Sequence, residues 1–82
     1  MQILYFSWLR EAIGTSLEDY QTDQKTVIGL INELVAREPR YAKAFEDLSI
    51  IKVAVDKELI SDLETSILDA KEVAFFPPMT GG

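Results

Sequence analysis

Two spacings of hydrophobic residues divide the chain, one typical of β-strands and one typical of an α-helix. Residues 2–7, 50–55 and 72–76 are short apolar runs rich in β-branched and aromatic side chains, which predicts three strands. Residues 26–38 instead repeat their hydrophobic positions at the spacing of one helix face. The pattern therefore predicts a sheet combined with one main helix.

The main helix has recognisable ends in the sequence. Thr26 is a suitable N-cap, and Pro39 gives the helix a reason to stop. Gly29 costs about 1 kcal/mol relative to alanine inside a helix, so we expect it to permit close packing. The side chains predicted to face the core are Val27, Leu30, Ile31, Leu34 and Val35.

Shorter elements are predicted between these segments. Residues 8–14 have hydrophobic positions four apart, which predicts a short helix that Gly14 ends in a left-handed conformation. Residues 16–22 are polar and irregular, which favours an edge strand. Residues 40–47 predict a second short helix because they place two aromatic side chains four residues apart.

The second half of the chain reads as strands with small connections. In the strand at 50–55, alternation places Ile51, Val53 and Val55 on one face, which should meet the helix. The Asp-Lys pair at 56–57 has the length of a tight hairpin turn leading into the next three residues. Residues 61–71 carry turn chemistry and predict one or two helical turns.

This order of elements predicts an α+β domain. A mixed sheet folded around one main helix, with short extra helices, is the β-grasp architecture of ubiquitin-like proteins. Neither an internal repeat nor a linker divides the chain. We expect one domain over residues 1–76, followed by an extended tail over residues 77–82.

Composition and charge exclude several classes of function. The 82 residues are 48% hydrophobic and 27% charged, which is the range of a globular domain. A net charge of −6 argues against nucleic acid as a partner, and no apolar run is long enough to span a bilayer. With no secretory signal either, we expect a cytoplasmic location. The acidity fits a basic protein partner, or serves solubility alone.

The chain contains neither cysteine nor histidine. It therefore has no disulfide, no thiolate nucleophile and no imidazole base, and we expect no metal site. Five carboxylates cluster in the second half without the spacing of a calcium loop, and we interpret them as solvated groups of turns and surface. They are Asp56, Glu58, Asp62, Glu64 and Asp69. Any chemistry has to use something other than a side-chain active site.

The C-terminal tail offers such a group. Pro77 and Pro78 end the sheet ladder and favour an extended path away from the domain. Residues 77–82 reach roughly 20 Å, and Gly81 and Gly82 have no Cβ to hinder entry into a narrow channel. The terminal carboxylate is then the one group presented for chemistry. The plain alternative is a frayed chain end.

The sequence resembles the small, sulfur-carrying subunit of molybdopterin synthase over essentially its full length. The resemblance rests on "YFSWLREAIG", "TVIGLINEL", "VAVDKELI" and above all on the terminal "EVAFFPPMTGG". Carriers of thiamine synthesis share the fold and the Gly-Gly end, but the Phe-Pro-Pro lead-in favours the molybdopterin branch. The one departure is "LDAKEVAF", where Ala70 and Lys71 replace the usual glycine turn and imply a different turn geometry.

The resemblance implies a mechanism and partners. A ubiquitin-activating-type adenylyltransferase would use ATP to adenylate the Gly82 carboxylate, and sulfur would replace AMP to give a thiocarboxylate. The tail would then enter the large synthase subunit and pass sulfur to cyclic pyranopterin monophosphate. Two small and two large subunits would form the synthase, with no cofactor permanently bound to this chain.

The resemblance also implies roles for single residues. Gly82 is the carrier and Gly81 its slender support, while Phe75 and Phe76 divide between the core and a docking surface. The residues expected to line the partner's channel are Pro77, Pro78, Met79 and Thr80. Trp8 and Arg10 are interface candidates because aromatic residues and arginine are enriched at hot spots, whereas Leu9 and Ile13 are expected in the core.

Other functions remain open from the sequence. The chain could instead be a ubiquitin-like modifier that is joined to lysines through Gly82, or a sulfur carrier for tRNA thiolation or thiamine synthesis. Both the carrier and the modifier require adenylation and differ only in what captures the acyl group. A plain interaction domain with an inert tail predicts no loss of activity when the two terminal glycines are removed.

Overall fold

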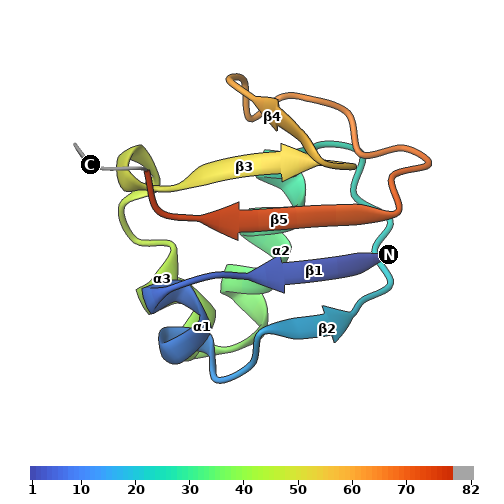
Figure 1. Ribbon diagram of the computed structural model, residues 1–82. Coiled ribbons are helices and arrows are strands. Elements are labelled where there is room, and N and C mark those ends of the chain that lie inside the picture. Colours follow the sequence, from blue (N-terminus) through green and yellow to red (C-terminus); the bar gives the residue numbers. More distant parts are fainter. Residues whose placement is uncertain (79–82) are drawn as a thin grey trace.

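The computed structural model describes residues 1–78, which form one sheet and a layer of helices. The elements are β1 (Gln2–Tyr5), α1 (Trp8–Ile13), β2 (Leu17–Asp19), α2 (Val27–Arg37), α3 (Pro39–Ala44), the 3-10 turn η1 (Leu48–Ile50), β3 (Lys52–Val55), β4 (Glu58–Ile60) and β5 (Glu72–Phe76). Figure 1 shows their arrangement. Every strand and helix predicted from spacing is present except the helical turns of residues 61–71.

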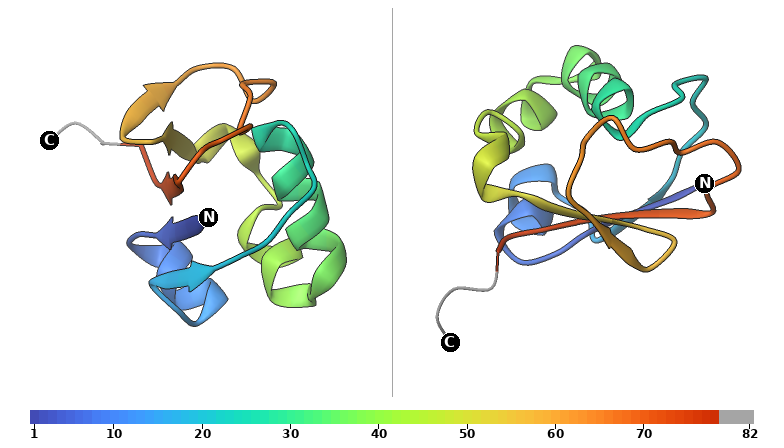
Figure 2. Two further views of the ribbon diagram at one scale, coloured as in Figure 1. Left: turned by 90° about the vertical axis from the view of Figure 1, so that its right-hand side faces the viewer. Right: turned by 90° about the horizontal axis from the view of Figure 1, so that it is seen from above.

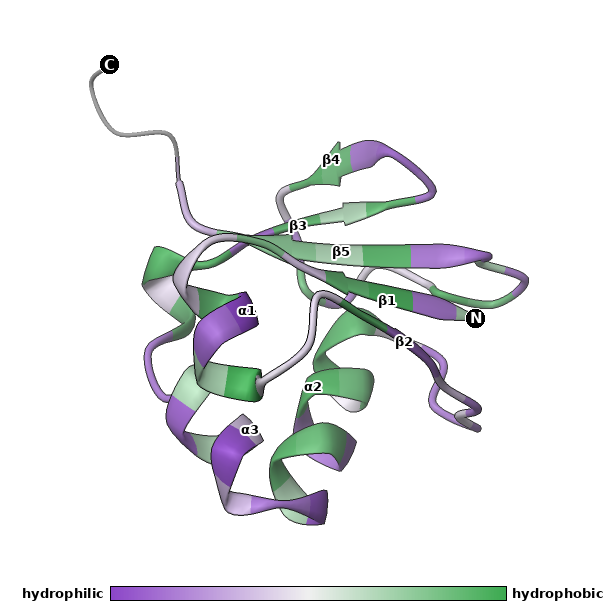
Figure 3. Cartoon of the chain, turned by 60° about the horizontal axis from the view of Figure 1, so that its bottom comes forward, coloured by the Kyte–Doolittle hydropathy of each residue, from purple (hydrophilic) through white to green (hydrophobic). Residues whose placement is uncertain are grey.

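The sheet has the strand order β2-β1-β5-β3-β4. The two central strands β1 and β5 run parallel, whereas the other neighbouring pairs are antiparallel. The helices lie on one face of this sheet, and the other face is left uncovered (Figures 2 and 3). The predicted α+β sheet folded around a main helix is therefore confirmed.

The core lies between α2 and the covered face of the sheet. Leu30 and Leu34 of α2 are fully buried, as are Val73 and Phe75 of β5. The same alternation holds in β3, where Val53 is buried between exposed or half-buried neighbours. Burial of these apolar faces is what holds short elements together, since isolated helices and hairpins of this length are marginal in water.

The ends of α2 agree with the signals in the sequence. The Thr26 hydroxyl accepts a hydrogen bond from the Gly29 N–H at 3.1 Å, as an N-cap does. A Cβ added at Gly29 would lie 2.6 Å from Gln24 Oε1, so close packing at this glycine is confirmed. Glu38 is extended, because a proline disfavours the helical conformation of the residue that precedes it. Pro39 then begins α3.

Tight turns shape the second half of the domain. Asp56 and Lys57 both have positive φ, 48° and 72°, and Val55 pairs with Glu58 across them, which confirms the predicted hairpin. Asp56 also accepts hydrogen bonds from the backbone N–H groups of Lys71 at 2.8 Å and Glu72 at 3.0 Å. The hairpin turn is thereby fastened to the start of β5.

The prediction of helical turns in residues 61–71 is wrong. The segment forms two turns instead, each closed by one backbone bond of its own, and several of its other backbone groups bond to the start of α2. Val27 N–H donates to the Thr65 carbonyl at 3.0 Å, and Ile67 N–H donates to the Lys25 carbonyl at 2.9 Å. These bonds to a distant segment replace the bonds of a local helix, and the helix propensity of residues 61–71 does not reveal them.

Candidate functional site: the root of the C-terminal tail

Strand β5 fixes the point from which the tail departs. It lies between β1 and β3, so its last residues are held on both sides. On one side the Phe6 N–H donates to the Phe75 carbonyl at 3.1 Å. On the other side Phe76 pairs with Lys52 of the antiparallel strand β3. Because β5 is parallel to β1, it ends at the opposite end of the sheet from the N-terminus (Figure 1). The tail root is therefore anchored on a central strand.

The two prolines follow directly after the end of β5. Pro77 and Pro78 are half-buried and belong to neither strand nor helix. The other tail residues assigned to the site, Met79, Thr80, Gly81 and Gly82, lie outside the described residues, and the roles assigned to them stay predictions. The same holds for the division into a domain of residues 1–76 and a tail of residues 77–82.

The two phenylalanines before the prolines have different surroundings. Phe75 is fully buried, with its ring stacked against Tyr5 at 6.0 Å and set edge-on to Phe45 at 5.0 Å. Alternation therefore turns the Phe75 side chain into the core, which rules out a partner contact of this side chain, and of the two phenylalanines Phe76 is the one with exposed area for docking. Phe76 is half-buried and meets the ring of Phe6 edge-on at 6.5 Å.

Two exposed aromatic residues follow β1, the strand that pairs with β5, and one of them, Phe6, contacts Phe76. Phe6 is 45% exposed and Trp8 is 37% exposed, which is unusual for side chains of this size. Arg10, the other predicted contact on α1, is also exposed, while Leu9 and Ile13 are buried as expected. Sequence reasoning missed Phe6, although alternation with the inward-facing Tyr5 already pointed it outward.

The uncovered face of the sheet carries a row of apolar residues, one from each strand, in register across all five. Leu17 pairs with Leu4, Leu4 with Ala74, Ala74 with Ala54, and Ala54 with Leu59. The two outer leucines are 46% and 67% exposed. This row was not singled out from the sequence, because its members become neighbours only when the strands are ordered.

A hydrogen-bonded carboxylate lies between the sheet and the helices. Glu18 of β2 accepts hydrogen bonds from the Tyr5 hydroxyl at 2.8 Å and the Tyr41 hydroxyl at 2.7 Å, with Arg37 at 3.5 Å. Burial alone favours the neutral acid, but the two hydroxyl donors and the guanidinium charge prevail and lower the pKa of Glu18 below its ordinary value. We call these four residues the Glu18 cluster.

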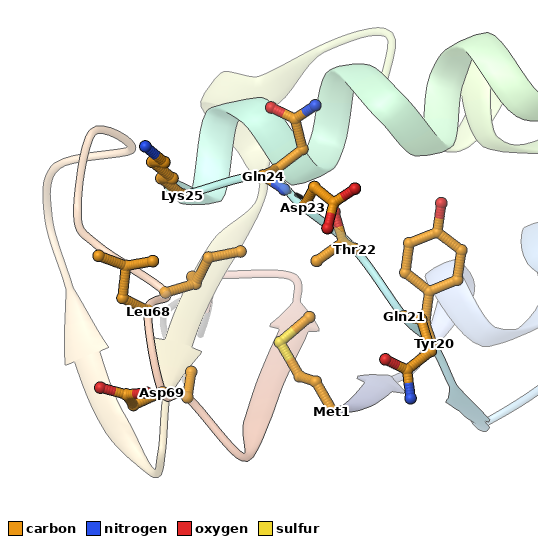
Figure 4. Close-up of a pocket in the computed structure, with 11 residues that line it drawn as sticks. Met1, Tyr20, Gln21, Thr22, Asp23, Gln24, Lys25, Leu68 and Asp69 are labelled. Carbon is orange, nitrogen blue, oxygen red and sulfur yellow. Dashed lines mark hydrogen bonds between the residues drawn. The ribbon is translucent and has the colours of Figure 1, made fainter.

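Elsewhere, the described residues offer little for side-chain chemistry. A hollow of about 330 Å³ opens between residues 20–25 and 67–70, beside Met1 and so near the end of the sheet opposite the tail root (Figure 4). Within residues 1–78, no three metal-binding side chains are grouped to hold an ion. No helix in the same range is long and apolar enough to cross a membrane.

Comparison with known proteins identifies the family. The sequence model of the ThiS family matches residues 3–82. The chain belongs to the ThiS family. Within it, the chain is 38% identical over 82 residues to the molybdopterin synthase sulfur carrier subunit of Escherichia coli K12, covering 100% of this chain and 99% of that protein. The subunit of the same name from Haemophilus influenzae is 32% identical over 82 residues, with 100% and 99% covered. The resemblance to sulfur-carrying subunits is confirmed.

Solved structures share this fold. SAMP1 from Haloferax volcanii superposes with a TM-score of 0.73 at 26% identity, covering 100% of this chain and 98% of that one. A Pyrococcus furiosus protein described as subunit 1 of a molybdopterin converting factor has a TM-score of 0.71 at 24% identity, with 95% of both chains covered. The β-grasp fold predicted from the order of elements is confirmed.

Proposed function

We propose that this chain is the sulfur carrier subunit of a molybdopterin synthase, working in the cytoplasm as one part of a sulfur-transferring enzyme. The observation that carries the proposal is the end-to-end match with sulfur carrier subunits, which includes the Gly-Gly terminus. The anchoring of β5 supports it, because a carrier has to present its terminus from a fixed point.

In the proposed reaction the Gly82 carboxylate attacks the α-phosphate of ATP on an adenylyltransferase, and pyrophosphate leaves. A sulfur donor then attacks the acyl adenylate and expels AMP, which gives a thiocarboxylate. In the active site of the large subunit this sulfur is transferred to cyclic pyranopterin monophosphate. Activation is needed because a carboxylate is a poor acyl donor, whereas AMP is a good leaving group.

Docking to the large subunit would use the surface around the tail root. Phe6 and Phe76 give exposed or half-buried aromatic area beside the departing tail, and Trp8 adds exposed aromatic area at the start of α1. Aromatic anchors of this kind carry much of the energy at protein interfaces. Arg10 would supply a polar contact at the rim.

The test is intact-protein mass spectrometry after incubation with the activating enzyme, ATP and a sulfur source. We expect a mass gain equal to one oxygen replaced by one sulfur, placed at Gly82 by fragmentation. The chain lacking Gly81 and Gly82 should show no gain, while an Arg10→Ala chain should be loaded with sulfur but bind the large subunit less tightly. An unaltered mass in the full-length chain would contradict the proposal.

A second function is favoured by one observation. The Haloferax volcanii protein that shares the fold over this whole chain is described as a small archaeal modifier protein. If Gly82 became linked to lysines of other proteins in the same experiment, the modifier function would replace the carrier function. Sulfur delivered to tRNA or to thiamine synthesis would instead leave the thiocarboxylate in place and change only its acceptor.

A further inference from the structure

We propose that Glu18 is a positioning residue for the C-terminal tail, holding the end of β5 in place through Tyr5. The link to sulfur transfer rests on the function proposed above, but the mechanical link between Glu18 and the tail root does not. Glu18 lies on the edge strand β2, and no family motif in the sequence singles it out. The Glu18 cluster brings it together with residues of β1, α2 and α3.

The contacts of Tyr5 connect the cluster to the tail root. Tyr5 is 1% exposed, pairs with Phe75 in the parallel register, and stacks on the Phe75 ring with an interplanar angle of 14°. The next residue, Phe6, closes the β1–β5 ladder by donating its N–H to the Phe75 carbonyl. A shift of the Tyr5 ring therefore moves β5, the strand that Pro77 follows.

The two tyrosine hydroxyls that bind Glu18 differ in the other hydrogen-bond partners that they have. The Tyr41 hydroxyl also accepts from Arg37 and from Arg40, both at 3.3 Å, so it keeps partners when Glu18 is lost. Among the described residues, Glu18 is the one hydrogen-bond partner of the Tyr5 hydroxyl. Because a buried hydroxyl without a partner is costly, the effect of losing Glu18 falls on Tyr5.

A matched pair of residues in the same protein gives the control. Tyr20 donates its hydroxyl to Glu33 of α2 at 3.0 Å, which is the same kind of bond as Tyr5 to Glu18. Thr22 also donates to Glu33, at 2.6 Å, so this carboxylate too binds two hydroxyls. In Figure 4, Tyr20 extends from the loop toward α2, and its backbone N–H donates to the Met1 carbonyl, at the end of the sheet opposite the tail root.

The experiment compares Tyr5→Phe with Tyr20→Phe by amide hydrogen exchange in the full-length chain. We expect Tyr5→Phe to accelerate exchange of the Phe6 amide at least tenfold more than that of the Leu30 amide, which is bonded to Thr26 inside α2. Tyr20→Phe should change the two amides by the same factor. A purely structural role of Tyr5 would also raise both amides together, since exchange would then follow global unfolding.

Two further variants decide whether the effect passes from Glu18 through Tyr5. Glu18→Ala, which removes the acceptor of the Tyr5 hydroxyl, should reproduce the selective acceleration at Phe6, and adding it to Tyr5→Phe should produce no further selective change. Equal changes at Phe6 and Leu30 in Tyr5→Phe, or additive effects in the double variant, would overturn the proposal. If Gly82 proved to carry no sulfur, the exchange result would stand unaffected.

Discussion

At the scale of single residues, the same side-chain type has opposite roles depending on where alternation turns it. Tyr5 and Phe75 face the helices and are buried, whereas their neighbours Phe6 and Phe76 face outward beside the tail root. Burial, together with the bond to Glu18, raises the pKa of Tyr5 far above its ordinary value of 10.0. Tyr5 therefore acts as a neutral donor throughout the physiological range.

Glu18 predicts a pH dependence of stability. Its folded-state pKa is lower than its ordinary 4.5, so its stabilising contribution is present above that value and is lost as pH falls through the folded-state pKa. The groups facing it are Tyr5 of β1, Tyr41 of α3 and Arg37 of α2. Unfolding free energies from about pH 7 to about pH 3 should fall less steeply for Glu18→Gln than for the wild type. Parallel curves for wild type and Glu18→Gln would contradict the assignment.

At the scale of elements, the strands, the helices and the hairpin turn followed from local spacing, but the long connection over residues 61–71 did not. The spacing predicted α2 and the hairpin after β3, and both are present. Residues 61–71 differ because their backbone bonds reach the start of α2. In the turn that precedes β5, where Ala70 and Lys71 implied a different geometry, the residue with positive φ is Asp69, at 64°, a left-handed conformation that Asp tolerates.

Substitutions of Asp56 measure how much its bonds to the start of β5 contribute to stability. Asp56→Ala removes the acceptor of two backbone N–H groups and places alanine at positive φ, which should cost about 2 kcal/mol of unfolding free energy in a urea titration. Asp56→Asn keeps an acceptor and tolerates the left-handed conformation, so its cost should be much smaller. Equal losses in the two variants would show that these bonds contribute nothing.

At the scale of the whole molecule, the fold fixes the point from which the tail departs. The sheet and helices place the end of β5 at one end of the molecule (Figure 1). There the half-buried Phe76 meets the ring of the exposed Phe6. The net charge of −6 belongs to the same scale, because it acts on an approaching partner as a field and not through one contact.

This field predicts salt-dependent association with a basic partner. The association rate with the large subunit should fall as ionic strength rises past about 0.1 M, where the Debye length is about 10 Å. Replacing the exposed Glu46 and Glu64 by glutamine should weaken this dependence while leaving dissociation unchanged. Stopped-flow binding measures both rates, and a rate independent of salt would mean that the acidity serves solubility alone.

The sequence by itself determined the strands and helices, the main core face of α2 and the candidate carrier at Gly82, because these depend on local spacing and on the chemistry of a terminus. Only the tertiary structure decided that Phe75 is core, that the apolar row crosses five strands, and that Glu18 connects to Tyr5 and Tyr41. These features join residues far apart in the chain. They exist only once strand order and register are set, and hydrophobic periodicity does not encode that order.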